Sequence, residues 1–100
     1  MKLLLITAVE AFEKDVKKIL SHSGVKSFSY QHVKGYKNES DGTLDNWFAS
    51  GHNEFNSLLF TVFIECECVN DIYKRVKTFN AKQESLSHIH IATLKIEETI

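Results

Sequence analysis

The chain has 100 residues, of which 43% are hydrophobic and 25% are charged. This length fits one domain, and this composition is typical of globular proteins rather than disordered or fibrous ones. The formal net charge of −1 provides no basic field, so the sequence predicts no binding to nucleic acid. We therefore expect residues 1–100 to fold as a single domain with one modest core.

The first ten residues, MKLLLITAVE, contain a short apolar run without a small-residue cleavage site. The run is too short to span a bilayer, and we predict no insertion into a membrane. Leu3–Ala8 is apolar on both alternating faces, which indicates a central strand covered on both sides. In the absence of a targeting segment we expect a cytoplasmic protein whose cysteines stay reduced.

The next segments read as a helix and a second strand. An amphipathic helix is predicted over Ala11–Ser23, and Gly24 follows where a helix terminator belongs. Val25–Val33 then alternates between aromatic or imidazole side chains and small polar ones, as a strand does. The apolar stripe of the helix consists of Phe12, Val16, Ile19 and Leu20.

The second half of the chain repeats this order. Leu58–Cys66 is rich in β-branched and aromatic residues and is the strongest predicted strand. A helix capped by Asn70 or Asp71 follows, then a polar connection over Asn80–Ser87 and a last strand over His88–Ile96. The apolar positions of this helix are Val69, Ile72, Val76 and Phe79.

The element order is thus β-α-β, a long loop, and β-α-β. Two such units joined by an antiparallel connection make the ferredoxin-like α+β sandwich, a βαββαβ fold with an antiparallel sheet. The right-handed crossover rule leaves few alternatives for this order.

The loop between strands 2 and 3, about residues 36–56, is polar and lacks helix or strand periodicity. Loops of this length are uncommon in small domains, and those that persist are usually functional or disordered. This one carries Trp47, Phe48 and Phe55. We predict that these aromatic residues bind a target protein; the alternative is that they fold back on the core of their own chain.

The N-terminal third, MKLLLITAVEAFEKDVKKILSHSGVKSFSYQHVKGY, resembles the P-II signalling proteins. The matching pieces are Lys2–Ile6, Val16–Leu20, Gly24–Val25 and Val33–Tyr36, and the last of these leads into a long loop as it does in that family. The resemblance covers nearly the whole chain in layout but is specific in its motifs only over the first 36 residues. It implies a homotrimer with ligand sites in the clefts between subunits and a loop that docks on a target, such as a membrane transporter or an enzyme.

The sequence departs from the ligand-binding motifs of that family. The glycine-rich loop base of the classical proteins is GYKNESDG here, without their glutamine, and their modifiable loop tyrosine has no equivalent. Their second glycine-rich loop is NAKQESLSHIHI here, without any glycine, and their C-terminal arginines are absent. Because glycine amides and cations cradle phosphates, the resemblance implies a divergent P-II-like protein, similar to short family members whose ligands differ from the classical ones or are unknown.

Five residues are candidates for the ligand cleft. Lys34, Gly35 and Lys37 flank the loop base, where an anion would meet two cations, and His88 and His90 begin the last strand. The ligand class stays open between an adenine nucleotide and a divalent transition metal.

Histidines and cysteines are the candidate metal ligands, since imidazole and thiolate suit Zn²⁺ and copper. The predicted topology brings His32, His88 and His90 to the end of the sheet where the loop with His52 begins, so these four are a candidate metal cluster. Cys66 and Cys68 are expected on one face of a strand, far from the histidines of the same subunit. The alternative reading is ordinary strand histidines and small buried cysteines.

The sequence contains no recognisable catalytic motif, and we predict that the protein is not an enzyme. The preferred hypothesis is a P-II-like regulatory protein with a ligand cleft and a target-binding loop. A transition-metal sensor or buffer linked to metal tolerance or efflux is the second hypothesis. A dimeric α+β barrel enzyme is a third.

Overall fold

The computed structural model describes residues 1–36, 54–84 and 86–100. Within these ranges the chain forms four strands, two α-helices and one short 3₁₀ helix, η1. In chain order they are β1 (Lys2–Val9), η1 (Glu10–Phe12), α1 (Glu13–His22), β2 (Ser29–Tyr36), β3 (Glu54–Ile64), α2 (Cys66–Lys82) and β4 (His90–Lys95).

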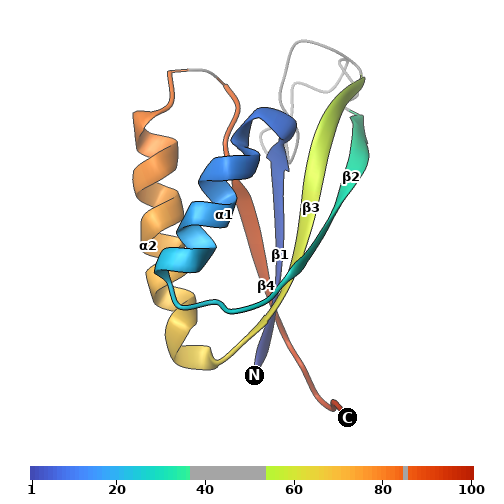
Figure 1. Cartoon of the computed structure of the whole chain (residues 1–100), viewed down its shortest axis with the longest axis vertical. Helices are drawn as coiled ribbons and strands as arrows, with labels where there is room; N and C mark the ends of the chain where they lie inside the picture. The colour runs from blue at the N-terminus through green and yellow to red at the C-terminus, as the bar shows by residue number, and fades with distance from the viewer. Residues whose placement is uncertain (37–53, 85) are drawn as a thin grey trace.

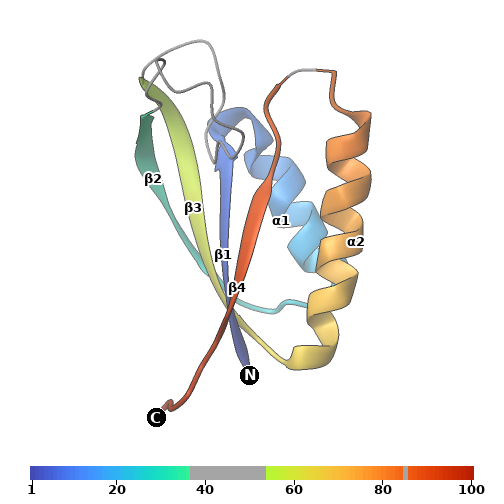
Figure 2. The ribbon, with the colours of Figure 1, turned by 180° about the vertical axis from the view of Figure 1, so that it is seen from behind.

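The strands form one sheet in the order β2-β3-β1-β4, with every neighbouring pair antiparallel. Both helices lie on the same side of this sheet and run in opposite directions (Figure 1). The view from behind shows the same two layers (Figure 2). The ferredoxin-like α+β fold predicted from the sequence is thus confirmed.

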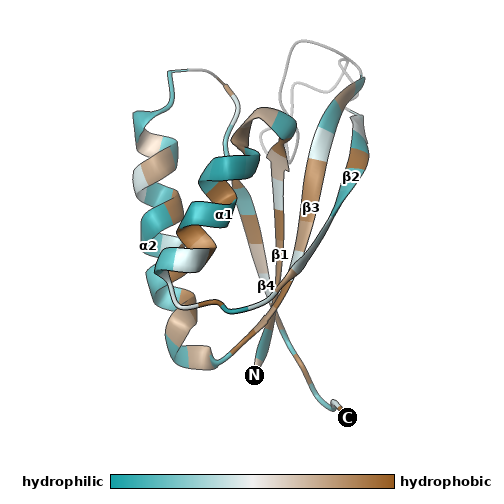
Figure 3. Cartoon of the chain, in the orientation of Figure 1, coloured by the Kyte–Doolittle hydropathy of each residue, from teal (hydrophilic) through white to brown (hydrophobic). Residues whose placement is uncertain are grey.

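The core lies between the sheet and the helices because alternate strand residues point at the helices. On the two central strands the core-facing residues are at most 5% exposed. Figure 3 shows the hydropathy of the strands and helices that enclose this core. Val16 and Leu20 of α1 and Ile72 and Val76 of α2 pack against these strand residues, which confirms the stripes predicted for both helices. The core-facing strand residues are Leu4, Ile6, Ala8, Leu58, Phe60, Val62 and Ile64.

The end of α1 is set by Gly24, as the sequence predicts. Gly24 has φ of +83°, a conformation that glycine adopts without steric cost. The Val25 N–H donates to the Leu20 carbonyl at 3.0 Å, and the Gly24 N–H donates to the Ser21 carbonyl at 3.1 Å. This pair of bonds is a Schellman motif, which satisfies carbonyls at the end of the helix.

The start of α2 differs from the prediction, because the helix begins at Cys66 and not near Asn70. Glu65 is extended (φ −71°, ψ 150°), and its carbonyl accepts a hydrogen bond from the Cys68 N–H at 3.1 Å. Cys66 and Cys68 therefore belong to the first helical turn. Since residues two apart on a helix lie about 200° apart around its axis, they do not share a face as they would on a strand.

The bounds of three strands also differ from the prediction. β2 begins at Ser29 rather than Val25 and extends to Tyr36, whereas β4 begins at His90 rather than His88. β3 begins at Glu54, four residues before the predicted strand. Phe55, predicted as a loop residue, instead lies in β3 opposite Gly35, where ladder pairing with β2 continues to Tyr36 and Glu54.

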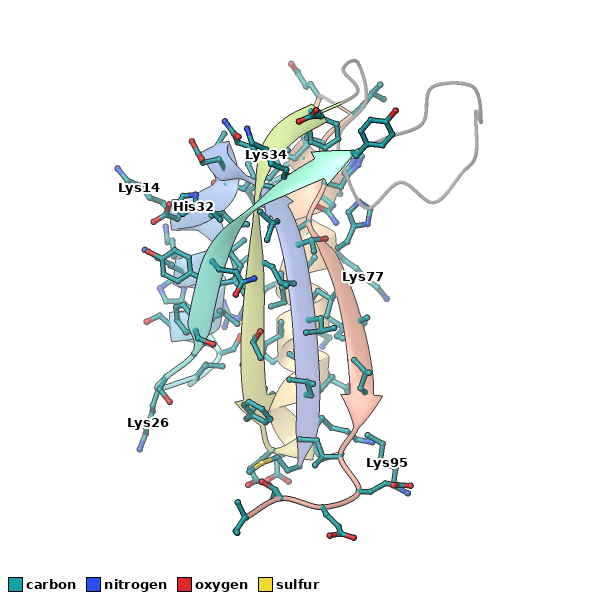
Figure 4. The ribbon with its side chains drawn as sticks, turned by 90° about the vertical axis from the view of Figure 1, so that its right-hand side faces the viewer. Lys14, Lys26, His32, Lys34, Lys77 and Lys95 are labelled. Atoms are coloured by element: carbon teal, nitrogen blue, oxygen red, sulfur yellow. The ribbon has the colours of Figure 1, made fainter. Side chains whose placement is uncertain are left out.

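The second face of the sheet, which we call the open face, is largely apolar, and no helix formed by residues 1–36, 54–84 and 86–100 covers it. It is visible in Figure 4, with the helices behind the sheet. Its central residues Leu5 and Leu59 are only partly buried, and Phe63 is 58% exposed. By strand register its apolar members are Leu3, Leu5, Val9, Val33, Phe55, Leu59, Phe63, Ala92 and Leu94.

Candidate functional site

The C-terminal end of β2 and the N-terminal end of β3 form a paired base at one end of the sheet. Lys34 donates from Nζ to Oδ1 of Asn56 across the two strands at 2.9 Å. Gly35 is buried and pairs with Phe55, while Tyr36 at the strand end is exposed. We call residues 34–36 and 54–56 the loop base. It presents one cation, Lys34, which its bond to Asn56 holds in place.

η1 supplies a carboxylate next to the loop base. Oε2 of Glu10 lies 3.3 Å from Nδ1 of His32, and both side chains are more than half exposed. The two meet because His32, Leu58 and Ala8 form one row across three strands, and Glu10 follows β1 directly. His32 therefore lies on the helix side of edge strand β2 with a carboxylate beside it.

The same edge carries a second polar network, which joins α1 to β2. Nζ of Lys17 donates to Oε2 of Glu13 at 2.7 Å and to the Tyr30 hydroxyl at 2.9 Å. The hydrogen bond from Lys17 lowers the pKa of Glu13 below its ordinary value of 4.5. The bond to Glu13 in turn raises the pKa of Lys17. This network fixes the edge of β2 to α1, since the Tyr30 ring also stacks on buried Phe60 with centroids 5.3 Å apart.

The connection between α2 and β4 is held by one side chain. Nδ2 of Asn80 donates to the Ile89 carbonyl at 2.9 Å, and Oδ1 of Asn80 accepts from the Ile89 N–H at 2.8 Å. Ile89 is 2% exposed and anchored in the core. Because Asn80 binds both the N–H and the carbonyl of Ile89, Ile89 does not pair with β1 and β4 begins only at His90. His88 and His90 therefore lie on either side of an anchored residue.

The structure separates the candidate histidines instead of clustering them. His32 lies on edge strand β2 on the helix side of the sheet, whereas His90 lies on the opposite edge, β4, and pairs with Thr7 of the open face. Figure 4 shows His32 beside β2. Among residues 1–36, 54–84 and 86–100, no three His, Cys, Asp or Glu side chains are grouped to hold a metal ion.

Several predicted site residues lie outside the described residues. These are Lys37 of the candidate ligand cleft, Trp47 and Phe48 of the target-binding loop, and His52 of the candidate metal cluster. Of the five cleft candidates, the structure therefore places Lys34, Gly35, His88 and His90. Lys34 and Gly35 lie at the loop base on β2, and the two histidines lie across the sheet at the start of β4.

Two hydroxyl residues on the open face were not singled out from the sequence. Ser57 is 1% exposed, Thr7 is 8% exposed, and Oγ of Ser57 has no hydrogen-bond partner in the described part of the chain. An unpartnered buried hydroxyl is unusual and indicates a position for a ligand or a partner group. The only sequence signal was a polar residue directly before the apolar run LLF in the segment FNSLLF.

Neither helix in the described part of the chain has the length and apolar character needed to cross a membrane. The sequence matches no protein-family model, and no curated protein is significantly similar to it. A solved structure does match the fold: that of CPII, a nitrogen regulatory PII-like protein from Thiomonas intermedia K12 bound to ADP, AMP and bicarbonate.

The superposition covers 99% of this chain and 94% of the CPII chain, with a TM-score of 0.65 and 14% sequence identity. The fold is that of a PII-like protein. The resemblance to the P-II proteins inferred from the first 36 residues is thus confirmed at the level of the fold. At this identity the likeness shows the fold alone, and what CPII binds is a property of CPII.

Proposed function

We propose that the protein is a small PII-like regulatory protein that acts in the cytoplasm as a homotrimer. It binds a small anionic ligand in the cleft between subunits, at the loop base. The segment that follows β2 binds a target protein, such as a membrane transporter or an enzyme, through Trp47 and Phe48. The protein catalyses no reaction in this account.

The open face is the observation that carries this proposal. Burial of an apolar face in water is favourable, and contiguous exposed apolar patches usually mark sites of association. β2 and β3 contribute to the open face and also form the loop base. Association through this face therefore brings the end of the sheet that holds the loop base to a boundary between subunits.

The chemistry of the loop base favours a small anion. Lys34 supplies a cation there and Lys37 follows it in sequence, while Glu54 adds one carboxylate to the loop base. Glycine amides that could wrap a chain of phosphates are few, because the α2–β4 connection has no glycine and is tied down by Asn80. Of the ligands in the CPII structure, bicarbonate needs the fewest such donors, and the adenine nucleotides need more.

Regulation requires that the ligand bind two states of the protein with different affinity, because only such a difference shifts their populations. Lys34 lies two residues from the end of β2, so an anion bound to it would act on the strand end that leads to Trp47. We propose that ligand binding and target binding are coupled through this strand end.

Two measurements test the proposal, and the first is the mass in solution. Light scattering should give three times the chain mass of 11.5 kDa. Twice the chain mass would contradict the trimer and favour the dimeric barrel enzyme.

The second measurement is calorimetric titration with bicarbonate, AMP, ADP, ATP and Zn²⁺. We expect binding of one of the anions and a loss of about tenfold in affinity in Lys34→Ala, because a charge-assisted contact is removed. Lys26→Ala is the matched control, since Lys26 is also exposed but precedes β2, near the end of this strand opposite to the loop base (Figure 4). Binding of Zn²⁺ alone would contradict the anion proposal and favour the metal sensor, with histidines of neighbouring subunits as ligands.

A further inference from the structure

The solvent side of the helix layer contains a groove between α1 and α2, with a volume of about 420 Å³. Its apolar surface comes from Ile19 of α1 and Phe79 of α2, two partly buried residues that pack on the core. The shorter helix α1 lies beside α2 on the same side of the sheet (Figure 1). The groove is on the opposite side of the molecule from the open face, so association through the open face leaves it accessible.

The groove concentrates positive charge. It is lined by four of the twelve Lys and Arg residues of the chain but by one of the thirteen Asp and Glu residues. With His22 neutral its lining carries a formal charge of +3, and since the whole chain carries −1, the remaining residues carry −4. The charged and imidazole side chains of the lining are Lys18, Lys74, Arg75, Lys82, Asp15 and His22.

Most of these cations are available to a partner. Arg75 is paired with Asp71 at 2.9 Å. The ammonium groups of Lys18, Lys74 and Lys82 form no ion pair within the described part of the chain, and all three residues are exposed. The groove therefore has an apolar floor with free positive charge on both rims.

The spacing of the rims matches a helix. Lys74, Thr78 and Lys82 follow at i, i+4 and i+8 on α2, so successive side chains are about 6 Å apart along the helix axis. Lys18 and His22 have the same spacing on α1. A third helix laid between them would present side chains at i, i+4 and i+8 with the same 6 Å period, which is how amphipathic helices occupy grooves.

We infer that this groove docks an acidic amphipathic helix of a partner protein. Its apolar side chains would cover Ile19 and Phe79, and its carboxylates would meet Lys18 on one rim and Lys74 and Lys82 on the other. The charge of −4 on the remainder of the chain disfavours a polyanion such as nucleic acid, which would extend beyond the groove. A short acidic helix would contact only the positively charged groove and not the negatively charged remainder of the chain.

The test uses the full chain and a designed helical peptide of about 18 residues, since shorter isolated helices are marginal in water. The peptide carries Glu at i, i+4 and i+8 on both flanks of a leucine stripe, and its affinity is measured by fluorescence anisotropy. The groove variant is Lys18→Glu with Lys74→Glu. The matched control, Lys14→Glu with Lys77→Glu, makes the same change of charge on the same two helices. Figure 4 shows Lys14 and Lys77 directed to opposite sides of the molecule, and neither lines the groove.

We expect the control to bind the peptide as the unaltered protein does, and the groove variant to bind at least about tenfold more weakly, with an affinity that falls as salt is raised. A peptide with Lys in place of Glu should show the reverse preference and bind the groove variant best. This exchange separates loss of charge complementarity from loss of fold, and melting curves of both variants verify that they are folded.

Equal weakening in the groove and control variants would overturn the inference, because the effect would then be one of net charge. The inference also fails if the peptide does not bind while an RNA oligonucleotide or vesicles of anionic lipid bind with the same dependence on Lys18 and Lys74.

Discussion

At the scale of single residues, Lys17 holds the edge of the sheet through hydrogen bonds to Glu13 and Tyr30. The contribution of Glu13 to the stability of the folded protein depends on pH, since its pKa is lowered on folding. A lowered pKa stabilises the folded state above the ordinary value of 4.5, and this stabilisation disappears as pH falls through the folded pKa. The raised pKa of Lys17 has the opposite effect. It stabilises the folded state below pH 10.5, and this stabilisation is lost as pH rises through the pKa of the folded protein.

We predict that Glu13→Gln lowers the melting temperature slightly at pH 7 and that the difference from the unaltered protein narrows below pH 4.5. The measurement is thermal unfolding followed by circular dichroism between pH 3 and pH 7. A difference that stays constant over this range would show that the Glu13 carboxylate does not act through its charge.

Asn80 shows the limit of inference from sequence at this scale. The polar character of Asn80–Ser87 predicted a connection, whereas α2 continues to Lys82. The sequence also did not predict that the Asn80 amide would bind both backbone groups of Ile89. This pair of hydrogen bonds joins residues that are nine positions apart in the sequence, and no local sequence pattern indicates such a contact. As a result the sequence placed the start of β4 two residues early, at His88 instead of His90.

At the scale of elements, α1 shows why some boundaries are predictable. Gly24 ends the helix because it alone adopts φ of +83° without steric cost, and both Schellman hydrogen bonds depend on that conformation. The start of α2 had no comparable signal. Cys66 and Cys68 suit a strand or a helix, and tertiary packing decided between them.

We predict that Gly24→Ala destabilises the protein by about 1–2 kcal/mol, the cost of placing an ordinary residue in the left-handed region. No atom lies within 4 Å of the position of the added Cβ, so the effect comes from the backbone and not from a clash. Chemical denaturation measures the loss. Gly24→Asn is the control and should lose less stability, because asparagine tolerates this conformation. An equal loss in both variants would contradict the left-handed conformation as the cause of the destabilisation.

At the scale of the whole molecule, the pattern of apolar residues along the strands and helices predicted one layer of helices packed on one sheet. It did not predict what covers the open face of that sheet. Leu3 and Leu5 lie in the segment that was predicted as a central strand covered on both sides, and Leu59 lies in the strongest predicted strand. The structure places these three leucines on the open face, where no helix in the described part of the chain covers them. A sequence pattern records that a face is apolar, but it does not tell whether the same chain or a second copy covers it.

We predict that Phe63→Lys breaks the trimer, because it places a charge at a 58% exposed position of the open face. Light scattering at a series of concentrations should show a shift to the single-chain mass. Leu86→Lys is the control: Leu86 is 75% exposed and lies in the α2–β4 connection, away from the open face. A trimer that persists in Phe63→Lys would assign the interface to another surface.

The candidate site was predictable in its position more than in its composition. Element order placed the ends of β2 and the starts of β3 and β4 at one end of the sheet, and the structure agrees. Element order did not distinguish the two edges of the sheet or its two faces, and it therefore grouped His32 with His90. In the structure these residues lie on the opposite edge strands β2 and β4 and on opposite faces of the sheet.

The most direct test of the central claim uses Trp47, the only tryptophan of the chain, as a reporter. Its fluorescence is followed while the ligand found by calorimetry is titrated into the trimer. We predict a saturable change in emission with the same midpoint as calorimetric binding, absent in Lys34→Ala at the same ligand concentration. A ligand that saturates the protein and leaves the emission of Trp47 unchanged would contradict coupling between the ligand cleft and the target-binding segment.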